Sequence, residues 1–196
     1  MSFKFCLATK NSSKAKEIQE ILRDFNCQIV LPEIKKLPEE TGTSFHENAL
    51  IKASFVSEIY KDIPVVAEDS GLVVPALDGL PGILSSRFAG PDADDGKNIE
   101  KLLKYMQLLK GEERNAYFIC MAVLIRKGRN PEFFEGRLYG RIAEEPAGTG
   151  GFGYDPVFRL LNNGKTLAQL SPEEKNRISH RAKAFIQLAK YLEMAV

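Results

Sequence analysis

In the stretch Ile63-Pro64-Val65-Val66-Ala67-Glu68-Asp69-Ser70-Gly71-Leu72-Val73-Val74, two acids, a hydroxyl and a glycine interrupt a run of apolar residues. The β-branched and aliphatic residues on either side are typical of a buried strand. Adjacent buried carboxylates cost several kcal/mol unless a cation neutralises them. Glu68 and Asp69 therefore have two interpretations. Either they lie in water where the strand ends in a turn, or they form a divalent-metal and general-base site at the edge of a sheet.

Strand and helix patterns alternate on both sides of this stretch. The patterns predict strands at 3–8, 27–31, 116–126 and 132–143, and helices at 13–25, 45–60, 98–109 and from 172 to the C-terminus. The first strand, helix and strand form a β-α-β unit, which favours parallel pairing. The two long strands are expected to form a hairpin around 127–130 and a second lobe. We therefore predict one α/β domain over residues 1–196, with a mixed β-sheet flanked by helices.

The composition narrows the class of protein. The 196 residues are 44% hydrophobic and carry a net charge of +1, so we expect a real core and no nucleic-acid or membrane partner. Cys6, Cys27 and Cys120 are odd in number and widely spaced, which fits neither a disulfide framework nor a zinc site. No apolar run is long enough to span a bilayer, and no signal-peptide pattern is present. We expect a reduced, cytoplasmic protein.

The loop after the first strand, Thr9-Lys10-Asn11-Ser12-Ser13-Lys14, crowds lysines at the start of a helix. Lys10, Lys14 and Lys16 have the wrong sign for the helix macrodipole, at a cost of roughly 0.3–1 kcal/mol each when exposed. A helix N-terminus with free N–H groups and lysines favours anion binding, so the loop is a candidate phosphate site. Because the loop is not a Walker-type glycine loop, an ordinary capped surface turn is the alternative.

A separate loop, Pro38-Glu39-Glu40-Thr41-Gly42, supplies further acids. By itself it is typical of a solvated acidic turn. Combined with Glu68 and Asp69, however, it offers a third carboxylate from a different part of the chain. Magnesium is usually held by one or two carboxylates together with waters and substrate phosphates. The loop is therefore a candidate contributor to a magnesium site.

The stretch Gly148-Thr149-Gly150-Gly151-Phe152-Gly153-Tyr154-Asp155-Pro156 is rich in glycine. Glycines allow the backbone to approach a flat ligand closely. Phe152 and Tyr154 could stack on a base, and Asp155 could accept a hydrogen bond from a ring N–H. The alternative is a flexible loop whose aromatic side chains cover the core. The proline and the aromatic residues favour a ligand site.

The stretch from Ser171 to Ala182 places donors near the start of the last helix. Lys175 could reach phosphates or a base, and His180 and Arg181 begin the helix, where N–H groups are free. A capped surface helix with Glu–Arg ion pairs is the alternative, and it would be preferred if this stretch stood alone.

Taken in order, these stretches resemble the inosine triphosphate pyrophosphatase family, whose members are also described as dITP/XTP pyrophosphatases. The resemblance covers essentially the whole chain and rests on the ordered set of motifs. Many bacterial relatives have Gly where Lys10 stands and Asp where Glu68 stands. The matching stretches are Ala8-Thr9-Lys10-Asn11-Ser12-Ser13-Lys14, Ser44-Phe45-His46-Glu47-Asn48-Ala49, Ala67-Glu68-Asp69-Ser70-Gly71-Leu72, Leu80-Pro81-Gly82, Gly151-Phe152-Gly153-Tyr154-Asp155-Pro156, Glu174-Lys175-Asn176 and Ser179-His180-Arg181.

The resemblance implies hydrolysis of ITP, dITP and XTP to the monophosphate and pyrophosphate, which removes deaminated purines from the nucleotide pool. It also implies Mg²⁺, a homodimer, and a long twisted mixed sheet in two lobes with the nucleotide site between them. Asp69 would be the general base for water attack on the α-phosphorus, and Glu39 and Asp69 would hold magnesium. The substrate would contact Thr9, Lys10, Asn11, Ser12, Ser13, Lys14, Ser70, Phe152, Gly153, Tyr154, Asp155, Lys175, His180 and Arg181.

Base selection follows in part from hydrogen bonding. Hypoxanthine and xanthine carry an acceptor oxygen where adenine carries an amino donor, so a pocket lined by Lys175, His180 and Arg181 would reject adenine. Rejection of guanine does not follow from the sequence. Two alternatives are a Maf-type pyrophosphatase acting on pyrimidine triphosphates and a non-catalytic nucleotide sensor. The sensor would not need the carboxylates of Glu39, Glu68 and Asp69.

Overall fold

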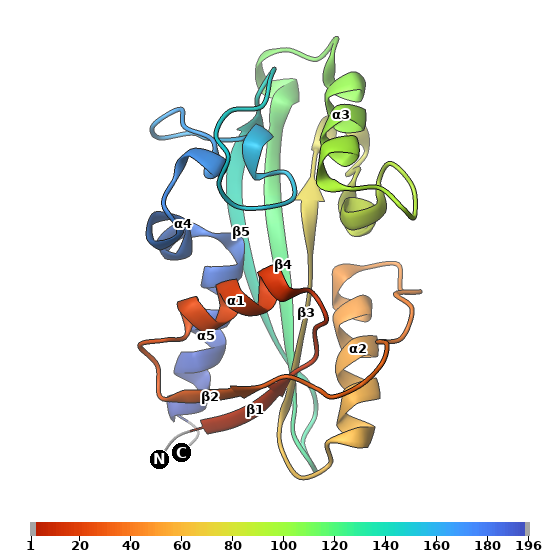
Figure 1. Cartoon of the computed structure of the whole chain (residues 1–196), viewed down its shortest axis with the longest axis vertical. Coiled ribbons are helices and arrows are strands. Elements are labelled where there is room, and N and C mark those ends of the chain that lie inside the picture. Colours follow the sequence, from red (N-terminus) through yellow and green to blue (C-terminus); the bar gives the residue numbers. More distant parts are fainter. Residues whose placement is uncertain (1–2, 195–196) are drawn as a thin grey trace. The chain divides into compact units, whose positions relative to one another are not determined.

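The computed structural model describes residues 3–194, and within them one sheet orders its six strands as β2-β1-β3-β4-β5-β6. The strands are β1 (Phe3–Leu7), β2 (Cys27–Val30), β3 (Val65–Val73), β4 (Asn115–Ile125), β5 (Glu132–Ile142) and β6 (Phe158–Leu160). Strand β1 pairs in parallel with β2 and with β3, whereas β5 pairs antiparallel with β6 (Figure 1). The sheet is therefore mixed, as the sequence predicts, and the β-α-β unit at the N-terminus is confirmed.

The α-helices of the described residues agree with the predicted ones but differ at their ends. They are α1 (Ser12–Ile21), α2 (Phe45–Ile59), α3 (Asp95–Met106), α4 (Pro172–Ile178) and α5 (His180–Met194). Helix α3 begins before the predicted residue 98 because the Asp94 side chain accepts a hydrogen bond from the Lys97 N–H at 2.8 Å and caps it. Ser179 has an extended backbone and separates α4 from α5. No helix within residues 3–194 is long and apolar enough to cross a membrane.

The two adjacent acids Glu68 and Asp69 lie inside β3, which continues past them to Val73. Glu68 is 3% exposed and Asp69 is 5% exposed. The interpretation of a strand that ends in a solvated turn is therefore wrong. Both carboxylates are buried in the middle of a strand, where they require neighbouring donors or cations.

The chain divides into two compact units. Unit 1 comprises residues 1–69, 120–136 and 180–196, and unit 2 comprises residues 70–119 and 137–179. The division passes through β3, β4 and β5, so unit 2 is not formed by the predicted hairpin alone. The organisation of residues 1–196 as a single domain stays a prediction.

In unit 1, alternate residues of β1 and β3 pack against different helices. Phe5 and Val66 share a hydrophobic core with residues of α1 and α5. Cys6 and Ala67 share another core with residues of α2. Because successive side chains of a strand point to opposite faces, Glu68 belongs to the first face, and Asp69 belongs to the second.

Unit 2 has its own hydrophobic core, which includes the rings of Phe118 and Phe158 with centroids 4.6 Å apart. The buried Arg114 guanidinium donates hydrogen bonds to the carbonyl oxygens of Met106 and Ile142, both at 2.8 Å. These bonds join the C-terminal end of α3 to the end of β5.

Candidate active site

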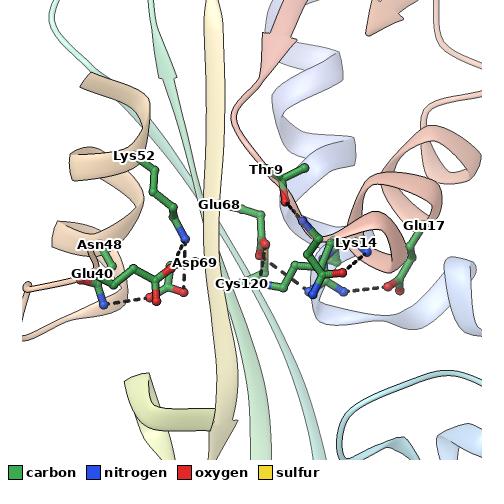
Figure 2. A network of polar contacts seen from close by, with 11 residues as sticks. Thr9, Lys14, Glu17, Glu40, Asn48, Lys52, Glu68, Asp69 and Cys120 are labelled. Carbon is green, nitrogen blue, oxygen red and sulfur yellow. Dashed lines mark hydrogen bonds and ion pairs between the residues drawn. The ribbon is translucent and has the colours of Figure 1, made fainter. Parts of the chain in front are cut away.

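The side chains of Glu68 and Asp69 enter two separate polar clusters in unit 1. Figure 2 shows the Asp69 carboxylate beside Asn48 and Lys52, and the Glu68 carboxylate on the other side of β3, beside Lys14. The alternation of side chains along β3 is the cause of this separation. Two residues that are adjacent in the sequence therefore have different neighbours and can have different functions.

The Asp69 cluster is built by α2 and the loop before it. Asn48 donates its side-chain N–H to Asp69 Oδ2 at 3.2 Å, and the Lys52 ammonium lies 3.7 Å from Asp69 Oδ1. The same ammonium is 2.5 Å from Glu40 Oε1. Asn48 and Lys52 are four residues apart on α2, so their side chains lie on the same face of the helix. The cluster contains two carboxylates and one ammonium, and its net charge is therefore negative.

The electrostatics of this cluster favour a reactive carboxylate at Asp69. Burial raises the pKa of the Asp69 carboxyl, and the negative charges of Glu40 and Glu68 act in the same direction, against the lowering by Lys52. Burial by itself would lower the pKa of Lys52, but the three carboxylates outweigh it and raise that pKa. Lys52 therefore stays charged. A carboxylate with a raised pKa beside a fixed cation is typical of a general base.

The Glu68 cluster is built by α1, α5 and β4. Glu68 Oε1 lies 2.7 Å from the Lys14 ammonium, and Glu68 Oε2 lies 3.7 Å from the Arg181 guanidinium. The thiol of Cys120 donates to Glu68 Oε2 at 3.5 Å. Arg181 also contacts Glu17 Oε2 at 2.7 Å. Burial opposes ionisation of Glu68, but Lys14 and Arg181 outweigh it, so the pKa of Glu68 lies well below its usual range.

The predicted phosphate loop forms the start of α1. Asn11 caps the helix by accepting a hydrogen bond from the Lys14 N–H at 3.0 Å, and Thr9 Oγ1 accepts one from the Asn11 N–H at 3.2 Å. Ser12 and Ser13 are exposed in the first turn, which contains no acid. The Lys10 ammonium donates to the carbonyl oxygen of Ile34 at 2.7 Å. The alternative of a capped helix therefore describes the local structure, and the phosphate site stays a prediction.

The structure separates the two adjacent acids Glu39 and Glu40. The Glu39 side chain is 80% exposed and lies 3.6 Å from the Lys36 ammonium. The Glu40 side chain is 25% exposed and pairs with Lys52, next to Asp69. The sequence predicts Glu39 as a metal ligand, and this stays a prediction; the structure places Glu40, and not Glu39, beside Lys52 and Asp69. The buried Lys52 requires an acid nearby, but two consecutive glutamates give no sequence signal for which of them meets it.

No group of three or more His, Cys, Asp or Glu side chains within residues 3–194 is arranged to hold a metal ion. A cation beside Asp69 and Glu40 would thus need oxygens from water or from substrate phosphates. This is the usual way in which magnesium is bound. The two carboxylates therefore fit a cation that brings its own waters or binds with substrate better than a structural metal.

The glycine-rich stretch and α4 form a second cluster, in unit 2. Asp155 Oδ2 accepts hydrogen bonds from the Phe152 N–H at 2.9 Å and from the Lys175 ammonium at 2.6 Å. The same ammonium lies 4.6 Å from the centroid of the Phe152 ring, which is a cation–π distance. Gly151 has a φ of +72°, and a Cβ there would lie 2.0 Å from Asp155 Oδ2. Glycine at 151 is therefore required for the aspartate to reach these donors.

The remaining predicted site residues have varied environments. Tyr154 is buried in the core of unit 2, and its hydroxyl donates to the Ser85 carbonyl oxygen at 2.8 Å. The Gly153 N–H donates to Asp95 Oδ2 at 2.6 Å. His180 is buried at the start of α5, and Ser70 follows Asp69 in β3. The structure thus groups Lys175 with Phe152 and Asp155, whereas Arg181 belongs to the Glu68 cluster.

Known proteins of similar sequence and structure match this chain over nearly its whole length. A sequence model of the Ham1 family matches residues 5–191. The chain is 48% identical to the dITP/XTP pyrophosphatase of Halalkalibacterium halodurans, over 95% of this chain and 97% of that protein. It is 45% identical to that of Listeria monocytogenes serotype 4b, over 98% and 96%. A solved structure of a HAM1 protein from Coxiella burnetii has a TM-score of 0.87 at 40% identity, covering 98% of this chain and 99% of that one.

Proposed function

This chain belongs to the Ham1 family, and we propose that it hydrolyses non-standard purine nucleoside triphosphates, namely ITP, dITP and XTP, to the monophosphate and pyrophosphate. The curated relatives described above are dITP/XTP pyrophosphatases that this chain matches over nearly its whole length. The observation that carries the proposal is the cluster of Asp69, Glu40 and Lys52 on one face of β3. A nucleotide sensor would not need this pair of carboxylates beside a buried lysine.

In the proposed reaction, Asp69 is the general base. Its carboxylate takes a proton from a water molecule whose oxygen forms a bond to the α-phosphorus. The bond between the α-phosphorus and the oxygen that bridges to the β-phosphate breaks, and pyrophosphate leaves with that oxygen. The hydrogen bond from Asn48 and the ammonium of Lys52 hold the Asp69 carboxylate in one orientation.

Asp69 and Glu40 are the residues that we propose to hold magnesium, and Glu39 stays a second candidate for this role. The carboxylates of Asp69 and Glu40 both lie close to the Lys52 ammonium, in a cluster of net negative charge. Bound there together with substrate, magnesium would neutralise negative charge on the phosphates.

The phosphate chain of the substrate is proposed to bind at the N-terminal end of α1. Lys14 supplies a cation there, and the free N–H groups of the first turn favour an anion. The first turn carries no acid that would repel phosphate. The further residues proposed to contact the phosphates or the sugar are Thr9, Lys10, Asn11, Ser12, Ser13 and Ser70.

The base is proposed to stack on Phe152 and to be read by donors. Lys175 is buried and already lies against Asp155 and the Phe152 ring, so its ammonium has a fixed position. A 6-oxo purine can accept from such a donor, whereas the amino group of adenine cannot. Asp155 would accept from the ring N–H, and the further proposed contacts are Gly153, Tyr154, His180 and Arg181.

The assembly and the location of the protein are also proposals. The family resemblance supports a homodimer, and sedimentation or light scattering at micromolar concentration would test it. All three cysteines of the chain are free thiols, which supports a reducing compartment such as the cytoplasm. A non-standard triphosphate in that compartment would otherwise be available to polymerases.

The decisive experiment measures the products formed from ITP, dITP and XTP with magnesium, with ATP, GTP and UTP as comparisons. We expect rapid formation of the monophosphate and pyrophosphate from the first three nucleotides. Release of orthophosphate would place the attack at the γ-phosphorus and overturn the proposed geometry. Preferred turnover of UTP would favour the pyrimidine alternative, and tight binding of ITP without turnover would favour a sensor.

A further inference from the structure

Glu68 is enclosed by donors on both of its carboxylate oxygens. The Lys14 ammonium is 2.7 Å from Oε1, while the Cys120 thiol and the Arg181 guanidinium are 3.5 Å and 3.7 Å from Oε2. The Glu68 side chain is 2% exposed. Its lone pairs are therefore directed at protein groups on α1, α5 and β4.

The charges of this cluster are balanced. Glu68 and Glu17 are opposed by Lys14 and Arg181, and the Glu17–Arg181 contact is 2.7 Å. The Asp69 cluster, in contrast, has two carboxylates for one ammonium. A cation is therefore attracted to the Asp69 cluster and not to the Glu68 cluster. Charge thus separates the functions of the two adjacent acids.

The exposure of the members shows which one can meet a ligand. The side chains of Glu68 and Arg181 are 2% exposed and that of Glu17 is 7% exposed, whereas that of Lys14 is 19% exposed. Lys14 and Glu17 are three residues apart on α1 and lie on the same face of the helix. Lys14 is therefore the member of this ion cluster that a ligand can reach, and Glu68 is the group that fixes the position of its ammonium.

We infer that Glu68 is a positioning residue, which holds the Lys14 ammonium at the N-terminal end of α1 for a substrate phosphate and takes no part as base or metal ligand. The inference rests on the proposed function, because it assigns a partner to the phosphate lysine of that site. A free lysine side chain has many rotamers, and a salt bridge at its ammonium reduces them before substrate binds. Glu17 supports the arrangement through Arg181, and Cys120 supports it directly.

The test is a double-mutant cycle between Glu68→Gln and Lys14→Gln, read by calorimetric binding of inorganic pyrophosphate and by the KM and kcat for ITP. Glu68→Gln should weaken pyrophosphate binding and raise KM by roughly tenfold, since a charge-assisted contact to Lys14 is lost. It should change kcat by less than about threefold and should not change the magnesium concentration that gives half-maximal activity. In the Lys14→Gln background, Glu68→Gln should have no further effect on binding.

Three results would overturn the inference. Additive effects of the two substitutions on pyrophosphate binding would show that Glu68 does not act through Lys14. A collapse of kcat with an unchanged KM would make Glu68 part of the chemical step. A large rise in the magnesium requirement would make it a metal ligand. Pyrophosphate binding needs no turnover, so the cycle still reports on the pair if wild-type protein fails to hydrolyse ITP, which is the separate failure of the proposed function.

Control variants distinguish positioning from loss of fold. Glu132→Gln removes another carboxylate of unit 1 that pairs with an arginine, Arg126, and it should leave KM unchanged. If Glu68→Gln does not fold, Glu68→Asp replaces it in the cycle. The aspartate keeps the negative charge, but its side chain is one methylene shorter, so its carboxylate lies farther from the Lys14 ammonium. We expect a smaller rise in KM than for Glu68→Gln and again no effect in the Lys14→Gln background.

Discussion

The two faces of β3 in unit 1 carry the same kind of group in opposite electrostatic states. Glu68 is surrounded by Lys14 and Arg181, and its pKa lies well below the usual range in spite of its burial. Asp69 is the next residue, and burial together with nearby carboxylates raises its pKa. The chemistry of a carboxylate is therefore set by the helix that it faces. On the face of β3 that packs against α1 and α5, Glu68 is fixed in ion pairs. On the face that packs against α2, Asp69 is a candidate general base.

The largest effect should come from Asp69→Asn, which is the direct way to break this comparison. The amide cannot accept the proton of the attacking water, so kcat for ITP should fall by roughly 10²- to 10⁴-fold. Steady-state kinetics measure this change, and Asp24→Asn at an 88% exposed side chain is the matched control. If Asp69→Asn keeps near-normal kcat, Asp69 is not the base.

A second prediction concerns stability on the other face of β3. Glu17→Ala leaves the Arg181 guanidinium, whose side chain is 2% exposed, with one of its carboxylates missing. Breaking a buried ion pair by removing one partner typically costs about 3–5 kcal/mol of unfolding free energy. Denaturant unfolding measures the loss. Glu40→Ala on the Asp69 face should reduce the unfolding free energy by less, because the Glu40 side chain is 25% exposed. A larger loss for Glu40→Ala than for Glu17→Ala would contradict the assignment of the stabilising ion pairs to the Glu68 face.

A third prediction separates recognition of the base from recognition of the phosphates. Phe152→Ala should weaken ITP binding by about 1–3 kcal/mol, since stacking of a base on an aromatic ring is lost. Binding of inorganic pyrophosphate should not change, because Phe152 belongs to unit 2 and the phosphate loop belongs to unit 1. Calorimetry with both ligands measures the difference. Equal losses for the two ligands would show that Phe152 supports the fold rather than the base.

The smallest effect is a pH dependence at a carboxylate outside β3. Burial opposes ionisation of Glu132, but hydrogen bonds from Arg126 and Tyr191 outweigh it and lower its pKa from the ordinary 4.5. The resulting stability is present above that ordinary pKa and is lost as the pH falls through the lowered one. Glu132→Gln should therefore reduce the unfolding free energy by less than about 1 kcal/mol at pH 7. The reduction should vanish in acid, and a constant difference from pH 7 to pH 3 would contradict this sign.

Much of the arrangement follows from local pattern. The period of two in β3 places Glu68 and Asp69 on opposite faces, and the helical spacing of Asn48 and Lys52 places both on one face of α2. Gly151 likewise belongs to the same short glycine-rich motif as the aspartate that it accommodates. Such features depend on residues that are close in the sequence, and they can be predicted from it.

The sequence by itself determined the alternation of strands and helices, the mixed sheet and the set of chemical groups. Only the tertiary structure decided that Glu40 rather than Glu39 meets Lys52, and that Arg181 pairs with Glu17, which lies 164 residues earlier in the chain. The physical reason is that burial of a charge depends on which distant segments pack together. Periodicity indicates which face a side chain occupies, whereas the partner on that face is supplied by another element.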